Sequence, residues 1–317
     1  MLSADRRRAR RPRAGWRTWP AATTVVAGVI GDPVDHSLSP ALHNAAFAEL
    51  ALDWAYVAFP VPSGRARAAV AAMVDLGIRG LSVTMPHKAG AAEACQRLSP
   101  VAERLGVVNT VTNLGGELAG DSTDGAGFVD SLADLGWSPE AKRCLVLGSG
   151  GAARAVVLAL AEAGAARVEV VGRRRDQVLA TAALAGKVGG EATVSSAEAA
   201  DLIVNATPVG MAGVGAETSG LPLGLVRESL GPGQLVADLV YAPATTPLIV
   251  AARARGSSTC NGLGMLIHQA ARQVTIWTGR DAPVEAMSAA ALRELGQRAG
   301  LRRPGDRPEF GEPAPPV

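Results

Sequence analysis

The sequence predicts an α/β protein built from two domains. Its 317 residues exceed an ordinary single domain and favour two. From residue 23 onward, apolar segments of strand length alternate with segments of helix length, which is typical of a mostly parallel sheet covered by helices. A glycine-rich turn also lies between an apolar segment at 143–147 and a helical one, as in nucleotide-binding units. The hydrophobic fraction of 48% is sufficient to fill such cores.

The first half of the chain begins with an apolar strand at 23–31 that ends in the turn signal Gly31-Asp32-Pro33. Ser39 and Pro40 then predict a helix start, because serine caps helices and proline suits the first helical position. Turn residues separate the elements that follow. These are a helix over 41–50, a strand over 56–61, a helix near 65–76, a strand over 80–85, a helix after Pro86, and a hairpin of 107–114 and 117–120 around Gly115-Gly116.

The second half repeats the alternation of strands and helices. A helix over 125–135 leads into the new unit, and two long helices at the end of the chain are expected to return to the first domain. The expected elements are strands at 143–147, 168–171, 201–205 and 235–238, and helices at 152–163, 265–278 and 284–299.

Composition and charge exclude several classes of function. Only 3% of the residues are aromatic, which argues against a surface that stacks nucleic-acid bases, and the net charge is only +2. Seven arginines lie within the first 17 residues against one acid, so the rest of the chain is mildly acidic. We expect disordered tails, Arg-rich over 1–22 and Pro-rich over 301–317. The basic start followed by 21–30 also resembles an export signal, but 25–30 fits the first strand better.

Cysteine and histidine usage predicts a cytoplasmic protein without a metal. The three cysteines form no CxxC pair, which fits a reducing compartment. No run of 18 apolar residues predicts a membrane span. The histidines have neither metal-ligand spacing nor an adjacent acidic cluster, so we interpret them as structural or surface residues. These residues are Cys95, Cys144 and Cys260, and His36, His43, His87 and His268.

A glycine turn indicates a nucleotide site. Gly148, Ser149, Gly150, Gly151 and Ala152 come directly after an apolar strand and open an alanine-rich helix. Glycines let the backbone approach a pyrophosphate, and the helix start offers free N–H groups. The alternative is a tight turn with a purely structural role.

The end of the next strand indicates which dinucleotide binds. NAD-binding folds usually carry an acidic residue there to hold the ribose 2′-hydroxyl. This chain has Arg173 and Arg174 instead, and guanidinium groups bind the 2′-phosphate of NADP. The alternative is a solvated arginine run, and Asp176 nearby would weaken the preference for NADP.

Lys88 and Asp124 are the candidate catalytic pair. Lys88 is one of only three lysines and follows the third strand, where parallel sheets place their sites. Asp124 lies at the junction of the two domains, where a carboxylate can orient an ammonium group. The alternative for Asp124 is a helix N-cap. Ser37 and Ser39, two residues apart after the first strand, can face one carboxylate, although Ser39 could simply cap its helix.

Eight motifs, in order from about residue 25 to 290, make the chain resemble shikimate dehydrogenases. They are Gly31-Asp32-Pro33 with His36-Ser37-Leu38-Ser39-Pro40 and His43-Asn44, Val83-Thr84-Met85-Pro86-His87-Lys88, Val108-Asn109-Thr110, Ser122-Thr123-Asp124-Gly125, Gly148–Ala153, Asn205-Ala206-Thr207-Pro208-Val209-Gly210-Met211, Asp238-Leu239-Val240-Tyr241-Ala242-Pro243 with Thr246-Pro247-Leu248, and Gly262-Leu263-Gly264-Met265-Leu266 with Gln269-Ala270.

The resemblance implies an N-terminal α/β substrate-binding domain with a mostly parallel sheet, over 23–124 and completed by 262–300, and a Rossmann-type NADP-binding domain over 125–261. It implies reversible, NADPH-dependent reduction of 3-dehydroshikimate to shikimate in aromatic amino acid and chorismate biosynthesis, by a monomer or homodimer. Lys88 and Asp124 would be catalytic. The substrate residues would be Ser37, Ser39, Thr84, Asn109, Tyr241 and Gln269. The cofactor residues would be Gly148, Ser149, Gly150, Gly151, Ala152, Arg173, Arg174, Asn205, Thr207, Gly262 and Met265.

The chain departs from the family pattern at two positions that bear on the site. Ser82 and Ser122 stand where the usual motifs carry asparagine, and both keep a small hydrogen-bonding side chain. The arginine triplet 173–175 also replaces the common Asn-Arg-Thr. A quinate/shikimate or aminoshikimate dehydrogenase is one alternative function, because one hydroxyl in a pocket is accepted or rejected by small changes. A non-catalytic binding paralogue is the other, although such a protein would need neither Lys88 nor Asp124.

Overall fold

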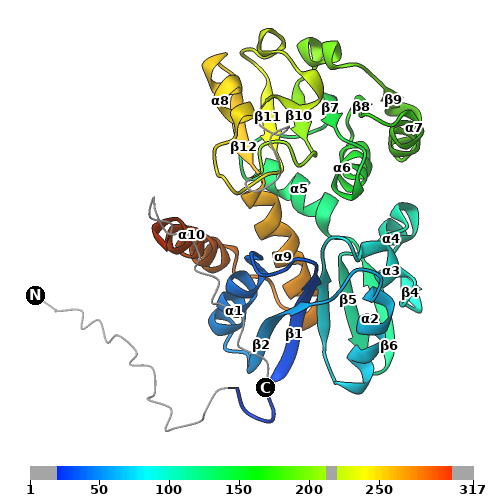
Figure 1. The fold of residues 1–317 in the computed structure, drawn as a ribbon, viewed down its shortest axis with the longest axis vertical. Helices are drawn as coiled ribbons and strands as arrows, with labels where there is room; N and C mark the ends of the chain where they lie inside the picture. The colour runs from blue at the N-terminus through cyan, green and yellow to red at the C-terminus, as the bar shows by residue number, and fades with distance from the viewer. Residues whose placement is uncertain (1–19, 212–219, 302–317) are drawn as a thin grey trace, which may run out of the picture.

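The computed structural model describes residues 20–211 and 220–301. Most of the expected N-terminal tail, and all of the C-terminal one beyond its first residue, lie outside these ranges. Within the described ranges, no helix is both long enough and apolar enough to cross a membrane. The elements form two lobes, each built around one six-stranded sheet, and the lobes are stacked along the long axis of the molecule (Figure 1).

The first sheet is mixed. β1 (Val25–Gly31) pairs in parallel with β2 (Trp54–Pro60) and β3 (Gly80–Val83). The hairpin of β5 (Thr110–Leu114) and β6 (Glu117–Asp121) then joins β3 in an antiparallel sense. A two-residue strand, β4 (Arg97–Leu98), completes the order β2-β1-β3-β5-β6-β4. The carboxyl ends of β1 and β3 and the start of β5 therefore lie at one edge of the sheet.

The helices of this lobe largely follow the sequence pattern. They are α1 (Ser39–Glu49), α2 (Ala66–Asp75), α3 (Lys88–Ala92) and α4 (Pro100–Leu105). The N-cap of α1 is Leu38, so the prediction that Ser39 caps this helix is wrong. Ser37 instead accepts a hydrogen bond from the Ser39 amide at 3.2 Å. The alternative of Asp124 as an N-cap is wrong in the same way, because Thr123 holds that position and Asp124 is the first helical residue.

The second sheet is wholly parallel, with the order β12-β11-β10-β7-β8-β9. Numbered within this lobe, the order is that of a Rossmann fold, with its switch point between β7 and β10. The strands are β7 (Arg143–Leu147), β8 (Arg167–Val171), β9 (Gly189–Glu191), β10 (Leu202–Asn205), β11 (Leu235–Asp238) and β12 (Ser258–Asn261). The structure therefore confirms the Rossmann-type prediction.

The helices of the second lobe and those that connect it to the first include α5 (Asp124–Ala133), α6 (Gly151–Glu162), α7 (Arg175–Ala183), α8 (Pro247–Ala254), α9 (Leu263–Thr278) and α10 (Val284–Leu301). Short 3-10 turns lie at Gly186–Val188, Val194–Ala199, Pro222–Gly224 and Arg227–Ser229.

Helix α9 runs from the second lobe down into the first, and α10 lies against α1 (Figure 1). Phe47 of α1, Val274 of α9 and Met287 of α10 belong to one buried cluster, so the last two helices complete the first core as expected. Helix α9 also packs closely on α5 at Gly127. A Cβ there would lie 2.5 Å from the amide nitrogen of Gln269, so only glycine permits this approach.

Candidate active site

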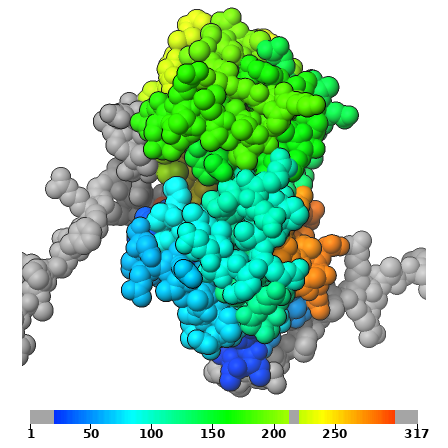
Figure 2. All heavy atoms as spheres, turned by 90° about the vertical axis from the view of Figure 1, so that its right-hand side faces the viewer, coloured from blue at the N-terminus to red at the C-terminus, as the bar shows by residue number. Residues whose placement is uncertain are grey.

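A cavity of about 370 Å³ lies where the two lobes meet. Its walls come from the carboxyl ends of β1 and β3, the starts of α3, α5 and α6, the segment after β11, and one face of α9. Figure 2 shows the two lobes in contact, the second in green above the first in blue and cyan. Twelve of the predicted site residues line this cavity. They are Ser37, Ser39, Thr84, Lys88, Asn109, Asp124, Gly151, Ala152, Tyr241, Gly262, Met265 and Gln269.

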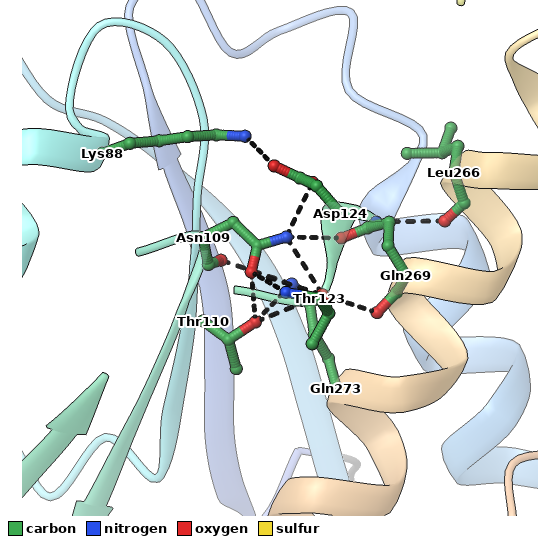
Figure 3. Close-up of polar contacts among 8 residues, drawn as sticks. All are labelled: Lys88, Asn109, Thr110, Thr123, Asp124, Leu266, Gln269 and Gln273. Atoms are coloured by element: carbon green, nitrogen blue, oxygen red, sulfur yellow. Dashed lines mark hydrogen bonds and ion pairs between the residues drawn. The ribbon is translucent and has the colours of Figure 1, made fainter. Parts of the chain in front are cut away.

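Lys88 and Asp124 form an ion pair across the cavity (Figure 3). Lys88 is the first residue of α3 and Asp124 the first residue of α5, so two helix starts aim the side chains at each other. The Lys88 side chain is 21% exposed and that of Asp124 is 12% exposed. The pair is therefore shielded from bulk water but open to the cavity, where an ammonium can exchange a proton with a bound molecule.

Asn109 fixes the carboxylate of Asp124. Its Nδ2 donates to Asp124 Oδ1 at 2.8 Å, which leaves Oδ2 of Asp124 for Lys88. The amide oxygen of Asn109 accepts from the backbone N–H of Thr123 at 2.8 Å and from the hydroxyl of Thr110 at 2.8 Å. Asn109 is 2% exposed, so these bonds are made without competition from solvent. The orientation of the Asp124 carboxylate is consequently set by a buried amide.

Gln269 extends this polar group from α9. Its Nε2 donates to the carbonyl of Leu266 at 3.0 Å, and its Oε1 accepts a long bond from Asn109 at 3.4 Å (Figure 3). Thr123 donates its hydroxyl to the Gln269 carbonyl at 3.1 Å, which ties α9 to the start of α5. The carboxamide of Gln269 therefore faces the cavity next to the Lys88–Asp124 pair.

Hydroxyl groups line the part of the cavity formed by the loop after β1. Ser37 and Ser39 line the cavity from this side, and Tyr241 lines it from the segment after β11. Arg298 of α10 supports this loop, donating to the carbonyls of His36 at 2.6 Å and Ser37 at 3.2 Å. Burial raises the pKa of Tyr241, so its phenol stays protonated and remains a donor. Three hydroxyl donors near a guanidinium form a suitable site for a carboxylate.

A second cavity, of about 520 Å³, lies over the glycine turn. It is lined by Ser149, Gly150 and Gly151, by the segment 105–107 of the first lobe, and by residues at the start of α7. Gly148 has a φ of +119°, which places the turn in a conformation that side chains rarely adopt. Within the described chain, no side chain caps α6, so its first N–H groups are available to an anion.

The three arginines after β8 have different surroundings. Arg174 lines the second cavity, whereas Arg175 is paired with Glu191 at 3.1 Å. Arg173 is exposed and lines neither cavity. Arg154, which the sequence analysis did not select, lines the second cavity beside Arg174 and donates to the Leu105 carbonyl at 2.8 Å. Its position in the first helical turn after the glycine motif could have marked Arg154 as a candidate cofactor residue.

Asn205 and Thr207 line neither of the two cavities. Asn205 is fully buried and donates to Asp238 Oδ1 at 2.9 Å and to the Val209 carbonyl at 3.1 Å. Its oxygen accepts from both the amide and the hydroxyl of Thr207. These bonds hold the loop after β10, and the expected contact of both residues with the cofactor stays a prediction. Gly148 shapes the turn without lining either cavity.

Comparison with known proteins agrees with this geometry. A family model described as the shikimate dehydrogenase substrate binding domain matches residues 29–111, and one described as the shikimate 5'-dehydrogenase C-terminal domain matches 262–292. A shikimate dehydrogenase (NADP(+)) of Moorella thermoacetica is 42% identical over 289 residues, covering 88% of this chain and 96% of the relative. One of Methanopyrus kandleri is 42% identical over 285 residues, covering 86% and 97%.

The chain belongs to the shikimate dehydrogenase family. Solved structures of family members have the same fold. A shikimate 5-dehydrogenase of Thermus thermophilus in complex with NADP(H) and shikimate superposes with a TM-score of 0.78 at 36% identity, over 85% of this chain and 99% of that one. A quinate dehydrogenase of Corynebacterium glutamicum in complex with NAD gives a TM-score of 0.77 at 29% identity, over 85% and 99%.

Three of the four histidines make structural contacts, whereas His36 is exposed and lines the cavity between the lobes. His43 is fully buried, and burial lowers its pKa to about 4. His87 bonds the Val61 carbonyl at 2.7 Å, and His268 bonds Asp134 at 2.6 Å. In the part of the chain that the structure describes, no group of three or more His, Cys, Asp or Glu residues could hold a metal ion.

Proposed function

We propose that the chain catalyses the reversible, NADP-dependent reduction of 3-dehydroshikimate to shikimate. The observation that carries this proposal is the Lys88–Asp124 pair, which lies in one cavity with a set of hydroxyl donors and with the start of the nucleotide-binding helix α6. Relatives that are 42–45% identical are named as NADP(+)-dependent shikimate dehydrogenases, and among the solved structures the shikimate dehydrogenases are 30–36% identical and the quinate dehydrogenase is 29% identical.

The residues over the glycine turn fit NADP. The uncapped start of α6 and the small residues Gly150 and Gly151 leave room for a pyrophosphate close to the backbone, since a Cβ at either glycine would meet no atom within 4 Å. Arg174 would hold the 2′-phosphate with Arg154 beside it. Gly262 and Met265 would face the nicotinamide end, where the two cavities share Gly151. When bound, NADPH supplies the hydride that reduces the ketone.

The substrate carboxylate would be held by the hydroxyls of Ser37, Ser39 and Tyr241, with Arg298 contributing positive charge behind the loop. This anchor would direct the opposite side of the ring toward Lys88, which lines the same cavity. Thr84, Asn109 and Gln269 lie around the same space and present donors and acceptors suited to ring hydroxyls. The polar lining therefore matches a small, hydroxylated carboxylic acid.

Lys88 would give its proton to the ketone oxygen as negative charge develops there, and would take it back in the reverse reaction. Asp124 holds the ammonium in place, while Asn109 keeps that carboxylate from rotating. A positioned acid of this kind contributes roughly 10²–10⁴-fold to a rate. Enclosure of the substrate between the two lobes would shield the transfer from water.

The variant Lys88→Ala tests the proposed mechanism. We expect kcat to fall at least 100-fold, while NADPH binding, followed by its fluorescence, stays within threefold of the wild type. We expect catalysis and cofactor binding to respond differently because Lys88 lines only the cavity between the lobes, here called the substrate cavity, and not the cavity over the glycine turn. A variant that retained a substantial kcat would show that another group supplies the proton.

A further inference from the structure

A chain of buried hydrogen bonds lies beneath the active site and ends at Asp124. It begins at Tyr56 on β2, whose hydroxyl donates to Ser82 Oγ at 2.6 Å. Ser82, on β3, donates to Gln273 Oε1 at 2.7 Å. Gln273, on α9, is fully buried, and its side chain bonds to two adjacent strands, β3 through Ser82 and β5 through Thr110. The Ser82 position is the one at which the family motif carries asparagine.

The chain continues from the other end of the Gln273 carboxamide. Gln273 Nε2 donates to the hydroxyl of Thr110 at 3.0 Å and to the Asn109 carbonyl at 3.3 Å (Figure 3). The Thr110 hydroxyl donates to Asn109 Oδ1 at 2.8 Å, and Asn109 Nδ2 donates to Asp124 Oδ1 at 2.8 Å. Every donor therefore points toward the catalytic carboxylate.

The donor and acceptor roles along this chain of hydrogen bonds are fixed by Tyr56. Burial raises the pKa of Tyr56, so its phenol keeps its proton and has to donate. The ring of His43 stacks on Tyr56 with centroids 4.0 Å apart and holds the phenol in place. Ser82 then has one proton left to give, which turns the oxygen of Gln273 toward β3 and its NH₂ group toward Thr110. In a low-dielectric interior such aligned bonds reinforce one another.

We propose that Gln273 is a positioning residue for the reaction, which holds Asn109 through Thr110 and thereby holds Asp124, and that its carboxamide replaces the one that the family motif carries at position 82. This inference rests on the proposed function. A serine at 82 is compatible with a carboxamide supplied by Gln273, because one hydroxyl both accepts from Tyr56 and donates to Gln273. An asparagine at 82 would instead fill the space that the Gln273 side chain occupies.

The expected effect is moderate. The backbone N–H of Thr123 also donates to Asn109 Oδ1, at 2.8 Å, so loss of Gln273 loosens Asn109 without releasing it. We therefore expect about a tenfold fall in kcat rather than the larger loss expected on removing a catalytic group. The KM for NADP⁺ is expected to stay within twofold, because Gln273 lines only the substrate cavity.

Two substitutions at Gln273 and one control separate positioning from packing. Gln273→Glu keeps the shape but cannot donate to Thr110 when it is ionised, and Gln273→Ala removes the carboxamide. The control is Gln234→Glu, which makes the same change at a buried amide in the second lobe, where Gln234 bonds the Ala197 carbonyl at 2.7 Å. We expect both Gln273 variants to lose about tenfold in kcat for shikimate oxidation, and the control to stay within twofold.

The double variant Ser82→Asn/Gln273→Ala carries the decisive test, because it buries no charge and restores a carboxamide from the other side. We expect its kcat within threefold of the wild type, whereas Ser82→Asn alone falls about tenfold from crowding. The inference is overturned if the Gln273 variants stay within twofold of the wild type, or if the double variant is no better than Gln273→Ala. Failure of the wild type to oxidise shikimate would overturn the proposed function instead.

Discussion

Replacing Asp124 by asparagine changes one atom of the proposed catalytic pair and keeps its shape. Oδ1 of Asp124 accepts from Asn109, and an asparagine oxygen can keep that bond. The new NH₂ group then stands where Oδ2 was and faces the Lys88 ammonium, so two donors oppose each other. The ammonium would turn away from the position in which it meets the substrate.

The effect on catalysis is expected to exceed the effect on stability. We predict at least a 100-fold lower kcat for Asp124→Asn, which corresponds to about 2.7 kcal/mol of transition-state stabilisation. The free energy of unfolding is expected to change by only about 1 kcal/mol, because Lys88 can turn into the open cavity and Asn109 keeps its partner. The assay is initial-rate formation of NADPH from shikimate, with a denaturant titration on the same protein.

The matched control is Asp134→Asn, at the other end of the same helix. Asp134 bonds His268 of α9 at 2.6 Å and is mostly exposed, so it offers the same chemical change away from the cavity. We expect its kcat within twofold of the wild type. A kcat for Asp124→Asn within threefold of the wild type would refute the view that this carboxylate holds the proton donor in place.

Three further predictions concern the cofactor, the helix contact and the pH dependence of stability. Arg174→Ala should raise the KM for NADP⁺ about tenfold and leave that for NAD⁺ unchanged, since Arg174 lines the cofactor cavity; equal changes in steady-state KM for the two cofactors would contradict this. Gly127→Ala should destabilise the fold by about 1–3 kcal/mol, because the new methyl would press on the Gln269 backbone; an unchanged denaturant midpoint would argue against this close contact. The pKa of His43 falls from 6.5 to about 4 on folding, so the unfolded chain binds the extra proton between these values and stability is lost as pH falls through that window, by about 3 kcal/mol. Urea titrations at pH 7 and pH 4.5, an interval that covers most of this window, should show a loss of about 2 kcal/mol in the wild type and a smaller one in His43→Asn.

Strong local patterns made most of the fold predictable. The strands at Arg143–Leu147 and Leu235–Asp238 begin and end as expected, because each contains a buried apolar run with a charged residue at one end. The strands Gly189–Glu191 and Ser258–Asn261 were not predicted, since they are glycine-rich or polar and are held by pairing to a neighbouring strand. Helix Pro100–Leu105 was missed although it has both a proline and a serine cap, because it is short and directly follows a two-residue strand.

The site residues that lie in sequence motifs were predictable. The buried residues that hold them in place were not. Lys88, Asp124 and Asn109 lie in recognisable motifs and meet in one cavity. Tyr56 and Gln273 belong to none of the motifs and lie far apart in the chain, so only the packing of α9 on the first sheet reveals their connection through Ser82. The prediction that Ser39 caps its helix failed for a similar reason. Ser37 and Ser39 look alike in the sequence, and only the folded loop shows that Ser37 accepts the hydrogen bond from the Ser39 amide.

The most direct test of the proposed function is the reduction of nicotinamide, followed by absorbance, with shikimate or quinate paired with NADP⁺ or NAD⁺. The carboxylate-binding hydroxyls, the Lys88–Asp124 pair and Arg174 together predict strong turnover only with shikimate and NADP⁺. A preference for quinate or for NAD⁺ would contradict the assigned specificity. No turnover in any of the four mixtures, from folded protein, would contradict the assigned function altogether.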